Sequence, residues 1–450
     1  QAEDGIRDVE RSRGLGDVYK RQDMQQENTH STSKVICGDG RIGELVINPE
    51  TGCVEFAIFC PDEDNVNRAN QVTNGHITYV KPACADQICT TGFGTKSGAV
   101  LLPTGPIDYG RESNLIEDVR DFIHSYVELN KDMEVLATYY VLFTWQFDRF
   151  DEVPYLRFFA HDIGCGKSRA LETVGYICYR PIFVAGSSSC ASLRRMVDSF
   201  QGTIVADEQD CKGNQDLTTN YIKMLNQGFQ RGRPVIVCNM KGDNFTPQKF
   251  DVFGPKLLVT RTKFNDDALE SRCFIVKMRP RTREDVPLNL PRKEFDERAL
   301  ILRNKLLKYR FDRYHRVELD RSLQVASVSD RLNQIAIPLL STVENEQERE
   351  RIVTHLKSLQ EELHENWANS DAGRIVQCLH EKWSVSNKDI LVGEIASYLN
   401  GAQAQLNVFR CDLPESLVTS RKVGQIIRDQ LGLKTSRTNK GFVVQRDNKR

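Results

Sequence analysis

The chain has 450 residues, 40% hydrophobic and 27% charged, which is typical of globular proteins and excludes a disordered or fibrous chain. Its 61 lysines and arginines balance 62 aspartates and glutamates, so the net charge of −1 indicates no partner by itself. No apolar run approaches the roughly 18–20 residues of a membrane helix, so we expect a soluble protein with no membrane partner. The 13 cysteines, an odd number with no signal peptide before them, predict reduced thiols and a cytoplasmic location.

The first 22 residues read as translated library sequence. Residues 1–8 are what a sequencing flow-cell adapter encodes, and residues 17–22 are what a transposase mosaic end encodes. We therefore expect residues 1–22 to be an artefact outside the fold, and the native N-terminus to be missing before Asp23. A natural basic N-terminal arm is the alternative.

A β-rich module is expected over residues 23–110, as the truncated remainder of a larger domain. Short β-like runs at 44–47, 54–58 and 76–80 are separated by turns rich in Gly, Pro and Asn. A zinc site is one hypothesis for its cysteines, but no CxxC pair is present, and free thiols are the better interpretation. These cysteines are Cys37, Cys53, Cys60, Cys84 and Cys89.

Strands and helices alternate over residues 151–280, after a helical lead-in over residues 111–150, and this alternation predicts an α/β fold with a parallel sheet. The expected strands are 155–160, 181–185, 203–206, 256–260 and 273–278. The expected helices between them are 167–178, 189–199, 217–229 and 266–271. Within residues 281–368, the segment 294–365 is expected to be almost wholly helical, and residues 369–450 are expected to form a separate unit.

A glycine-rich turn joins the first strand to its helix: Gly164-Cys165-Gly166-Lys167-Ser168. Glycines allow successive backbone N–H groups to face an anion, and the helix N-terminus adds the positive end of its dipole. Lys167 can reach the β- and γ-phosphates of ATP, and the Ser168 hydroxyl can ligate Mg²⁺. This context predicts a phosphate-binding loop.

The loop departs from the full pattern G-x-x-x-x-G-K-[ST], because His161 stands where that pattern has glycine. A plain glycine turn before an ordinary helix is therefore the alternative interpretation. We count Arg169, the next residue of the helix, with the nucleotide-binding residues of the loop.

Two carboxylates end the strand at 203–206, about 40 residues after the loop lysine. We expect Asp207 to hold Mg²⁺ through water and Glu208 to polarise the attacking water. Two acidic residues at a strand end are usually solvated caps, but the glycine loop upstream favours nucleotide hydrolysis.

Arg272 ends the helix at 266–271 and opens the next strand. An arginine there can reach across a subunit boundary to a neighbour's γ-phosphate and stabilise the charge of the transition state. This interpretation predicts a homo-oligomer, since such an arginine has no use in a monomer. The alternative is a surface arginine in an ion pair.

At these residues the chain resembles the AAA+ ATPases over roughly residues 135–345. Ser271-Arg272-Cys273 is similar to the arginine-finger motif of clamp-loader subunits. The resemblance implies a γ-phosphate sensor twelve positions earlier, at Thr260, where that family often has Asn. The stretches around the loop and around Arg272 are closely similar to primase- or helicase-associated ATPases of phages, plasmids, integrated elements and archaea.

A β-hairpin is expected over residues 233–253, with Lys241 and Lys249 near its tip. AAA+ helicases of the replicative type carry a hairpin just before this sensor, and it projects into the DNA channel. The resemblance thus implies that both lysines contact DNA, although a plain surface hairpin is an equal alternative.

The helices after Met278 resemble the AAA+ lid. Arg331, which opens a helix, is our candidate for a second phosphate sensor in that lid. Arg303 and Arg310 are the competing candidates.

Three helices and a terminal hairpin over residues 369–450 predict a winged helix. Residues 419–450 contain nine lysines and arginines and two aspartates, which gives a local charge of +7. Such a surface favours binding to nucleic-acid phosphates, although a solvated basic tail or a protein-binding winged helix is the alternative. The expected DNA contacts are Arg421, Lys422 and Arg428 on the third helix, and Arg437 and Lys440 on the wing.

Together these features predict a cytoplasmic AAA+ ATPase that uses ATP and Mg²⁺, forms a ring, and acts as a DNA helicase or translocase for a mobile element or virus. The expected partner is single-stranded or forked DNA, with duplex bound through the winged helix. A primase partner is implied only by analogy. The alternative is an ATP-dependent loader or DNA-bound regulator that unwinds nothing. A small-molecule kinase is disfavoured, because Glu208 and Arg272 suit attack by water and activation by a neighbour.

Overall fold

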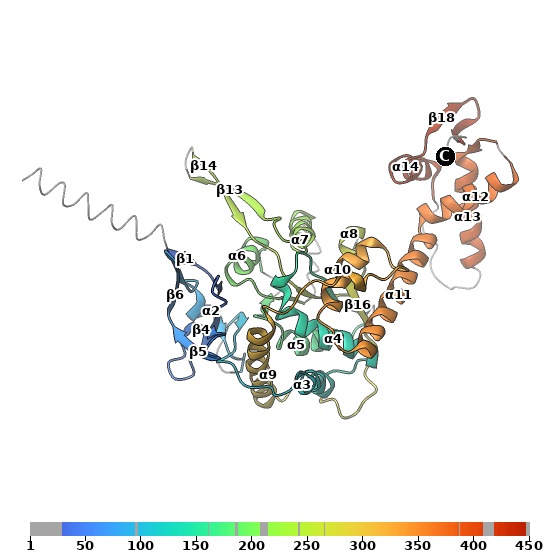
Figure 1. Cartoon of the computed structure of the whole chain (residues 1–450). Coiled ribbons are helices and arrows are strands. Elements are labelled where there is room, and N and C mark those ends of the chain that lie inside the picture. The colour runs from blue at the N-terminus through green and yellow to red at the C-terminus, as the bar shows by residue number, and fades with distance from the viewer. Residues whose placement is uncertain are drawn as a thin grey trace, which may run out of the picture. The chain divides into compact units, whose positions relative to one another are not determined.

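The computed structural model describes residues 29–94, 98–160, 162–184, 188–207, 215–241, 244–264, 266–386, 388–407 and 418–446 (Figure 1). The chain divides into two compact units between Leu356 and Lys357. The first unit is mixed α/β, as the alternating pattern predicts, and the second combines helices with a small sheet.

A seven-stranded sheet forms the centre of the first unit. In spatial order its strands are β16 (Cys273–Lys277), β10 (Tyr155–Phe159), β15 (Lys256–Thr260), β12 (Ile204–Ala206), β11 (Ile182–Val184), β9 (Val100–Leu101) and β8 (Cys89–Thr90). The first five run parallel, whereas β9 pairs antiparallel with β11. Strands β10 and β12 are buried at every residue, because helices on both faces of a parallel sheet exclude water from both sides.

Helices connect these strands as the periodicity predicts, with bounds within a few residues of those expected. They are α3 (Glu112–Tyr126), α4 (Lys131–Thr144), α5 (Lys167–Gly175), α6 (Cys190–Phe200), α7 (Gln215–Gln227) and α8 (Asp267–Glu270). Polar side chains fix several of their starts. Asn130 accepts from the Met133 amide before α4, and Ser189 accepts from the Ser192 amide before α6. The helices that follow the sheet are α9 (Arg292–Arg313), α10 (Asp330–Leu340) and α11 (Glu346–Asn369).

The β-rich segment before the sheet belongs to the same compact unit. One of its sheets is antiparallel and contains β2 (Lys34–Ile36), β3 (Ile42–Ile47), β4 (Val54–Cys60) and β5 (Asn65–Ala69). A smaller sheet contains β1 (Thr29–Ser31), β7 (Ile77–Val80) and β6 (Gln71–Asn74). The cysteines of this segment are free thiols, and no cluster of three or more His, Cys, Asp or Glu in the described ranges could hold a metal ion.

A long antiparallel hairpin, β13 (Val235–Lys241) with β14 (Asn244–Phe250), lies between α7 and β15. Figure 1 shows it extending away from the sheet and its helices. The ladder pairs Lys241 with Asn244 at the far end and Ile236 with Lys249 near the base. The expectation that both lysines lie near the tip is therefore wrong for Lys249, because the ladder places it five residues beyond Asn244, opposite Ile236 near the base.

The second unit contains α12 (Asp371–Val385), β17 (Ile390–Leu391), α13 (Val392–Asn407), α14 (Ser420–Asp429), β18 (Thr435–Thr438) and β19 (Gly441–Val444). Its three strands pair in the order β17-β19-β18, all antiparallel. Its own apolar core is formed by side chains from all three helices and the sheet, among them Ile375, Ile395, Ile427 and Val444.

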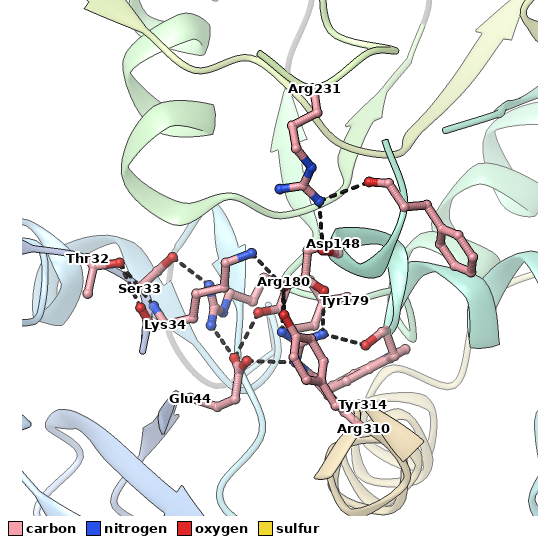
Figure 2. Close-up of polar contacts among 12 residues, drawn as sticks. Thr32, Ser33, Lys34, Glu44, Asp148, Tyr179, Arg180, Arg231, Arg310 and Tyr314 are labelled. Carbon is pink, nitrogen blue, oxygen red and sulfur yellow. Dashed lines mark hydrogen bonds and ion pairs between the residues drawn. The ribbon is translucent and has the colours of Figure 1, made fainter. Parts of the chain in front are cut away.

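A buried cluster of charges joins the β-rich segment to the sheet and to α9 (Figure 2). Glu44 on β3 is 1% exposed and accepts hydrogen bonds from Arg180, from Arg310 Nε at 2.7 Å and from the Tyr179 hydroxyl at 2.8 Å. Arg310 on α9 also donates both of its terminal nitrogens to Asp148, at 2.8 Å each. These contacts connect three segments that are far apart in the sequence.

Lys34 and Arg180 each make one further contact in this cluster. The Lys34 ammonium lies 2.6 Å from Asp148, and Arg180 donates to the Ser33 hydroxyl. Burial would raise the pKa of Asp148, but Arg310 and Lys34 outweigh burial and hold that pKa well below its ordinary value. The three cations outnumber the two carboxylates, and burial lowers the pKa of Lys34.

Glu44→Gln should destabilise the first unit strongly, because it leaves the buried guanidinium groups of Arg180 and Arg310 without their shared carboxylate. Removing one partner of a buried ion pair costs about 3–5 kcal/mol of unfolding free energy. Urea unfolding followed by tryptophan fluorescence measures this loss.

Asp39→Asn is the matched control, since Asp39 pairs with Arg41 at the exposed end of the same sheet. Its unfolding midpoint should equal that of the wild type. Equal midpoints for Glu44→Gln and Asp39→Asn would show that the buried cluster contributes little.

Candidate functional site

The glycine loop follows β10 and ends where α5 begins at Lys167. Gly164 and Gly166 have φ angles of +81° and +75°, in the left-handed region that favours glycine. Cys165 between them is buried at 3% exposure, whereas both glycines are exposed. The chain therefore curls at this point and presents glycine backbone to solvent at the start of a helix.

The next three side chains take different directions. Lys167 is 7% exposed, and its ammonium donates to the Asp162 carbonyl at 2.7 Å, so it folds back over the loop. Ser168 is exposed in the first turn of α5. Arg169 donates to the carbonyls of Pro287 and Leu288 at 3.0 and 2.8 Å, so its guanidinium holds the segment before α9.

Parallel pairing brings three strand ends to the same edge of the sheet. Phe159 at the end of β10 pairs with Thr260 at the end of β15, and Ala206 at the end of β12 pairs with Leu258. Neighbouring strands lie about 4.8 Å apart, so Thr260 lies one strand from the loop and Asp207 two strands from it. The sheet order thus gathers the loop, Thr260 and Asp207, while Glu208 lies outside the described residues.

Two side-chain oxygens at this edge are buried. Neither Asp207 Oδ1 nor Thr260 Oγ1 has a hydrogen bond to any residue that the structure describes. A buried polar atom left unpaired is costly, so these two oxygens beside the glycine loop have hydrogen-bonding capacity that a bound polar ligand could use. The Asp207 carboxylate and the exposed Ser168 hydroxyl are suitable oxygen donors for Mg²⁺ or for the water around it, so these two residues fit that ion.

Arg272 turns toward its own chain. It is 7% exposed, donates to the Asn226 side-chain oxygen, and lies 4.1 Å over the centre of the Phe229 ring. Burial lowers the pKa of Arg272, and the charge of Arg331 lowers it further. Its guanidinium therefore lies at the end of α7, which leads into the β13–β14 hairpin.

Arg331 lies in the first turn of α10, as expected, and is exposed. The two competing candidates, Arg310 and Arg303, make contacts in other parts of the unit. Arg310 is in the buried charge cluster, and Arg303 is fully buried and donates to the carbonyls of Tyr176, at 2.7 Å, and Thr91. Of the three arginines, only Arg331 combines exposure with a charge that acts on Arg272.

Arg157 and Lys256 are buried near the site, and neither was predicted from the sequence to have a role there. Arg157 on β10 forms a two-pronged ion pair with Glu270 on α8, at 2.9 and 2.6 Å, and Glu270 also accepts from the Phe264 amide. The pair connects the strand that leads into the glycine loop to the helix that precedes Arg272. The available signal was a charged residue in the middle of the apolar run at 155–159.

Lys256, the first residue of β15, is also fully buried. Its ammonium donates to the carbonyls of Gly228, Val252 and Gly254 at 3.0, 3.2 and 2.7 Å. Burial lowers the pKa of Lys256 to about 7. This lysine connects the end of α7 and the base of the hairpin to the strand that ends at Thr260.

The basic residues expected to contact DNA in the second unit fall into two groups. Arg421, Arg428 and Lys440 line one groove of about 1250 Å³ between α13, α14 and the β18–β19 hairpin. Lys422 instead pairs with Asp371 at 2.7 Å, and Arg437 is exposed opposite Phe442 in the ladder, outside the groove lining. In the first unit Lys249 is exposed, and Lys241 ends β13.

Comparisons with known proteins give only distant likenesses. No protein-family model matches the sequence, and no curated protein matches it. Among solved structures, the chain is similar to the C-terminal region of NrS-1 (11% identity, 89% of this chain and 95% of that chain, TM-score 0.36). It is also similar to SCCmec type IV Cch, an active helicase (12%, 92% and 97%, TM-score 0.37), and to an MCM homologue from Methanopyrus kandleri (9%, 72% and 77%, TM-score 0.33).

At TM-scores this low, the likenesses carry no argument about the activity of this chain. A separate observation concerns membranes: among the helices described here, none combines the length and the apolar character needed to cross a bilayer.

Asp207→Asn tests whether the unpaired oxygens mark a cation site. MgATP should raise the thermal unfolding midpoint of the wild type by mass action. Loss of the carboxylate should weaken MgATP binding about tenfold, which removes about 1.4 kcal/mol of that stabilisation. The ligand-free midpoint should stay unchanged, and differential scanning fluorimetry measures both.

Asp162→Asn is the control, because that side chain is exposed beside the same loop. It should keep the full MgATP shift. A full shift in Asp207→Asn as well would contradict a role for Asp207 at a cation site.

Proposed function

We propose that the chain is an ATPase of the AAA+ type, with an AAA+ core, a helical lid over residues 281–368 and a C-terminal winged helix. The observation that carries the proposal is the pair of unpaired buried oxygens, Asp207 Oδ1 and Thr260 Oγ1, at the sheet edge that also ends in the glycine loop. A loop of left-handed glycines followed by a lysine and a serine is suited to a nucleotide's phosphates.

Each residue of the site has its own role in binding or hydrolysing ATP. Backbone N–H groups of residues 164–168 bind phosphate, and Lys167 leaves the Asp162 carbonyl to contact the β- and γ-phosphates. Ser168 and Asp207 hold Mg²⁺, which when bound neutralises phosphate charge. Glu208 polarises the attacking water, and Thr260 donates to the γ-phosphate. Arg331 contacts phosphate from the lid, whereas the Arg169 contacts with residues 287–288 favour a role in joining α5 to the lid.

Arg272 acts on the nucleotide of a neighbouring copy, so the active form is a homo-oligomer, most simply a ring. In the single chain this guanidinium has no carboxylate partner among the described residues and is held by one amide oxygen and one ring face. Both contacts are weaker than an ion pair with a carboxylate, so Arg272 can leave them when a neighbour presents a phosphate.

DNA is the proposed substrate of the motor, which moves or unwinds strands in the replication of a phage, plasmid or integrated element. A primase is the proposed partner protein. The hairpin supports this proposal, because its base is joined through Lys256 to the strand of Thr260. A shift of the Thr260 strand on loss of the γ-phosphate can thereby move the hairpin and Lys241 at its far end. The basic groove of the second unit supports a separate contact with nucleic acid.

A mixing experiment tests the shared site. Lys167→Ala lacks its own phosphate contact and Arg272→Ala lacks the arginine for its neighbour, so each alone should lose about a thousandfold or more of its ATP hydrolysis. In an equal mixture, about a quarter of the interfaces join an intact loop to an intact arginine. Phosphate release should therefore recover to about a quarter of the wild-type rate.

Two controls make the mixing result interpretable. Each variant mixed with itself at the same total concentration should stay inactive, and each should unfold at the wild-type temperature. A mixture no more active than its components, or full activity in Arg272→Ala alone, would contradict the shared site.

A further inference from the structure

The groove of the second unit is formed entirely within that unit. Its walls are the start of α13, one face of α14 and the β18–β19 hairpin, and it encloses about 1250 Å³. It lies among elements that share one apolar core, so its shape does not depend on the first unit.

The charge of the groove is strongly positive. Arg421, Arg428 and Lys440 line it, and none of the three has an ion pair with a carboxylate in the described part of the chain. Its one acidic lining residue, Glu394, is already paired with Lys382 at 3.1 Å. Three unneutralised cations in one groove fit a ligand with several negative charges along its length.

The groove also has an apolar surface that phosphate contacts do not explain. Phe442 on β19 lines it and is 51% exposed. Gly424 lines the floor from within α14, where glycine is less favourable for a helix than alanine. A Cβ at this position would lie 3.3 Å from an Arg428 nitrogen and 3.7 Å from Val392, so glycine leaves room in the groove beside these two side chains.

We propose that this groove binds an unpaired DNA strand, with phosphates on Arg421, Arg428 and Lys440 and a base stacked on Phe442. An unpaired base offers a free aromatic face, and stacking on a protein ring is a general means of binding single strands. The bases of an intact duplex are already stacked on one another, so a duplex would use the cations and leave the ring exposed. The proposal rests on the proposed function and deepens it, since it names a single strand, in place of the duplex expected from the sequence, as the DNA that the second unit binds.

The test measures binding by the full chain without nucleotide, using fluorescein-labelled oligothymidine and a duplex of the same length. Phe442→Ala should weaken binding to the single strand about tenfold and leave duplex binding unchanged. Arg421→Ala should weaken binding to both DNAs. For the single strand, it should also reduce the slope of the logarithm of the binding constant against the logarithm of the salt concentration by about 0.7. Phe442→Trp should restore binding, and its fluorescence, after subtraction of the wild-type signal, should be quenched by oligothymidine.

Lys388→Ala is the matched control, because Lys388 is exposed in the same unit and lies outside the groove lining. It should bind both DNAs nearly as well as the wild type. Equal losses for both DNAs in Phe442→Ala, no loss at all, or an unquenched Phe442→Trp would overturn the proposal. None of these readings depends on ATP hydrolysis, so the groove and the proposed ATPase can fail separately.

Discussion

The parallel pairing of β10, β15 and β12 is the constraint on which the rest of this structure depends. Parallel strands place their carboxyl ends at one edge, and here that edge receives the glycine loop, Thr260 and Asp207. Buried side chains then fix what surrounds the edge. Arg157 and Glu270 hold α8 to β10, and Lys256 holds the hairpin base to β15. The proposed chemistry therefore rests on contacts inside the sheet as much as on the loop itself.

Buried ion pairs recur where segments distant in the sequence must stay together. Glu44 and Asp148 are joined through Arg310, so the β-rich segment, the sheet and α9 share one charge cluster (Figure 2). Such clusters are costly to desolvate, and once formed they tolerate no loss of a partner. These ion pairs add to the apolar packing of buried residues such as Leu45, Val46 and Phe56, and together they make the segment an integral part of the first unit.

Local patterns allowed much of the fold to be predicted, and long-range contacts account for what was missed. The strand at 256–260 matches its predicted bounds, because an apolar run flanked by glycine and polar residues leaves few alternatives. Lys249 was misplaced, because hairpin register depends on where the chain turns. Arg157 is a charged residue within an apolar run, which marks it as unusual, but its partner Glu270 is 113 residues away and no local pattern identifies it. Lys256 binds the nearby carbonyls of Val252 and Gly254, but its contact with Gly228 required the structure. The loop residues were found through spacing alone, whereas the contacts of Arg272 with Asn226 and Phe229 required the structure.

The most direct measurement is steady-state phosphate release from MgATP by the full chain, with and without single-stranded DNA, beside Lys167→Ala. The account predicts release that single-stranded DNA stimulates and that Lys167→Ala abolishes. Phosphate release at the same rate with and without DNA would favour the loader or regulator over the motor. No release from the wild type, or equal release from Lys167→Ala, would contradict the assignment of this sheet edge as an ATPase site.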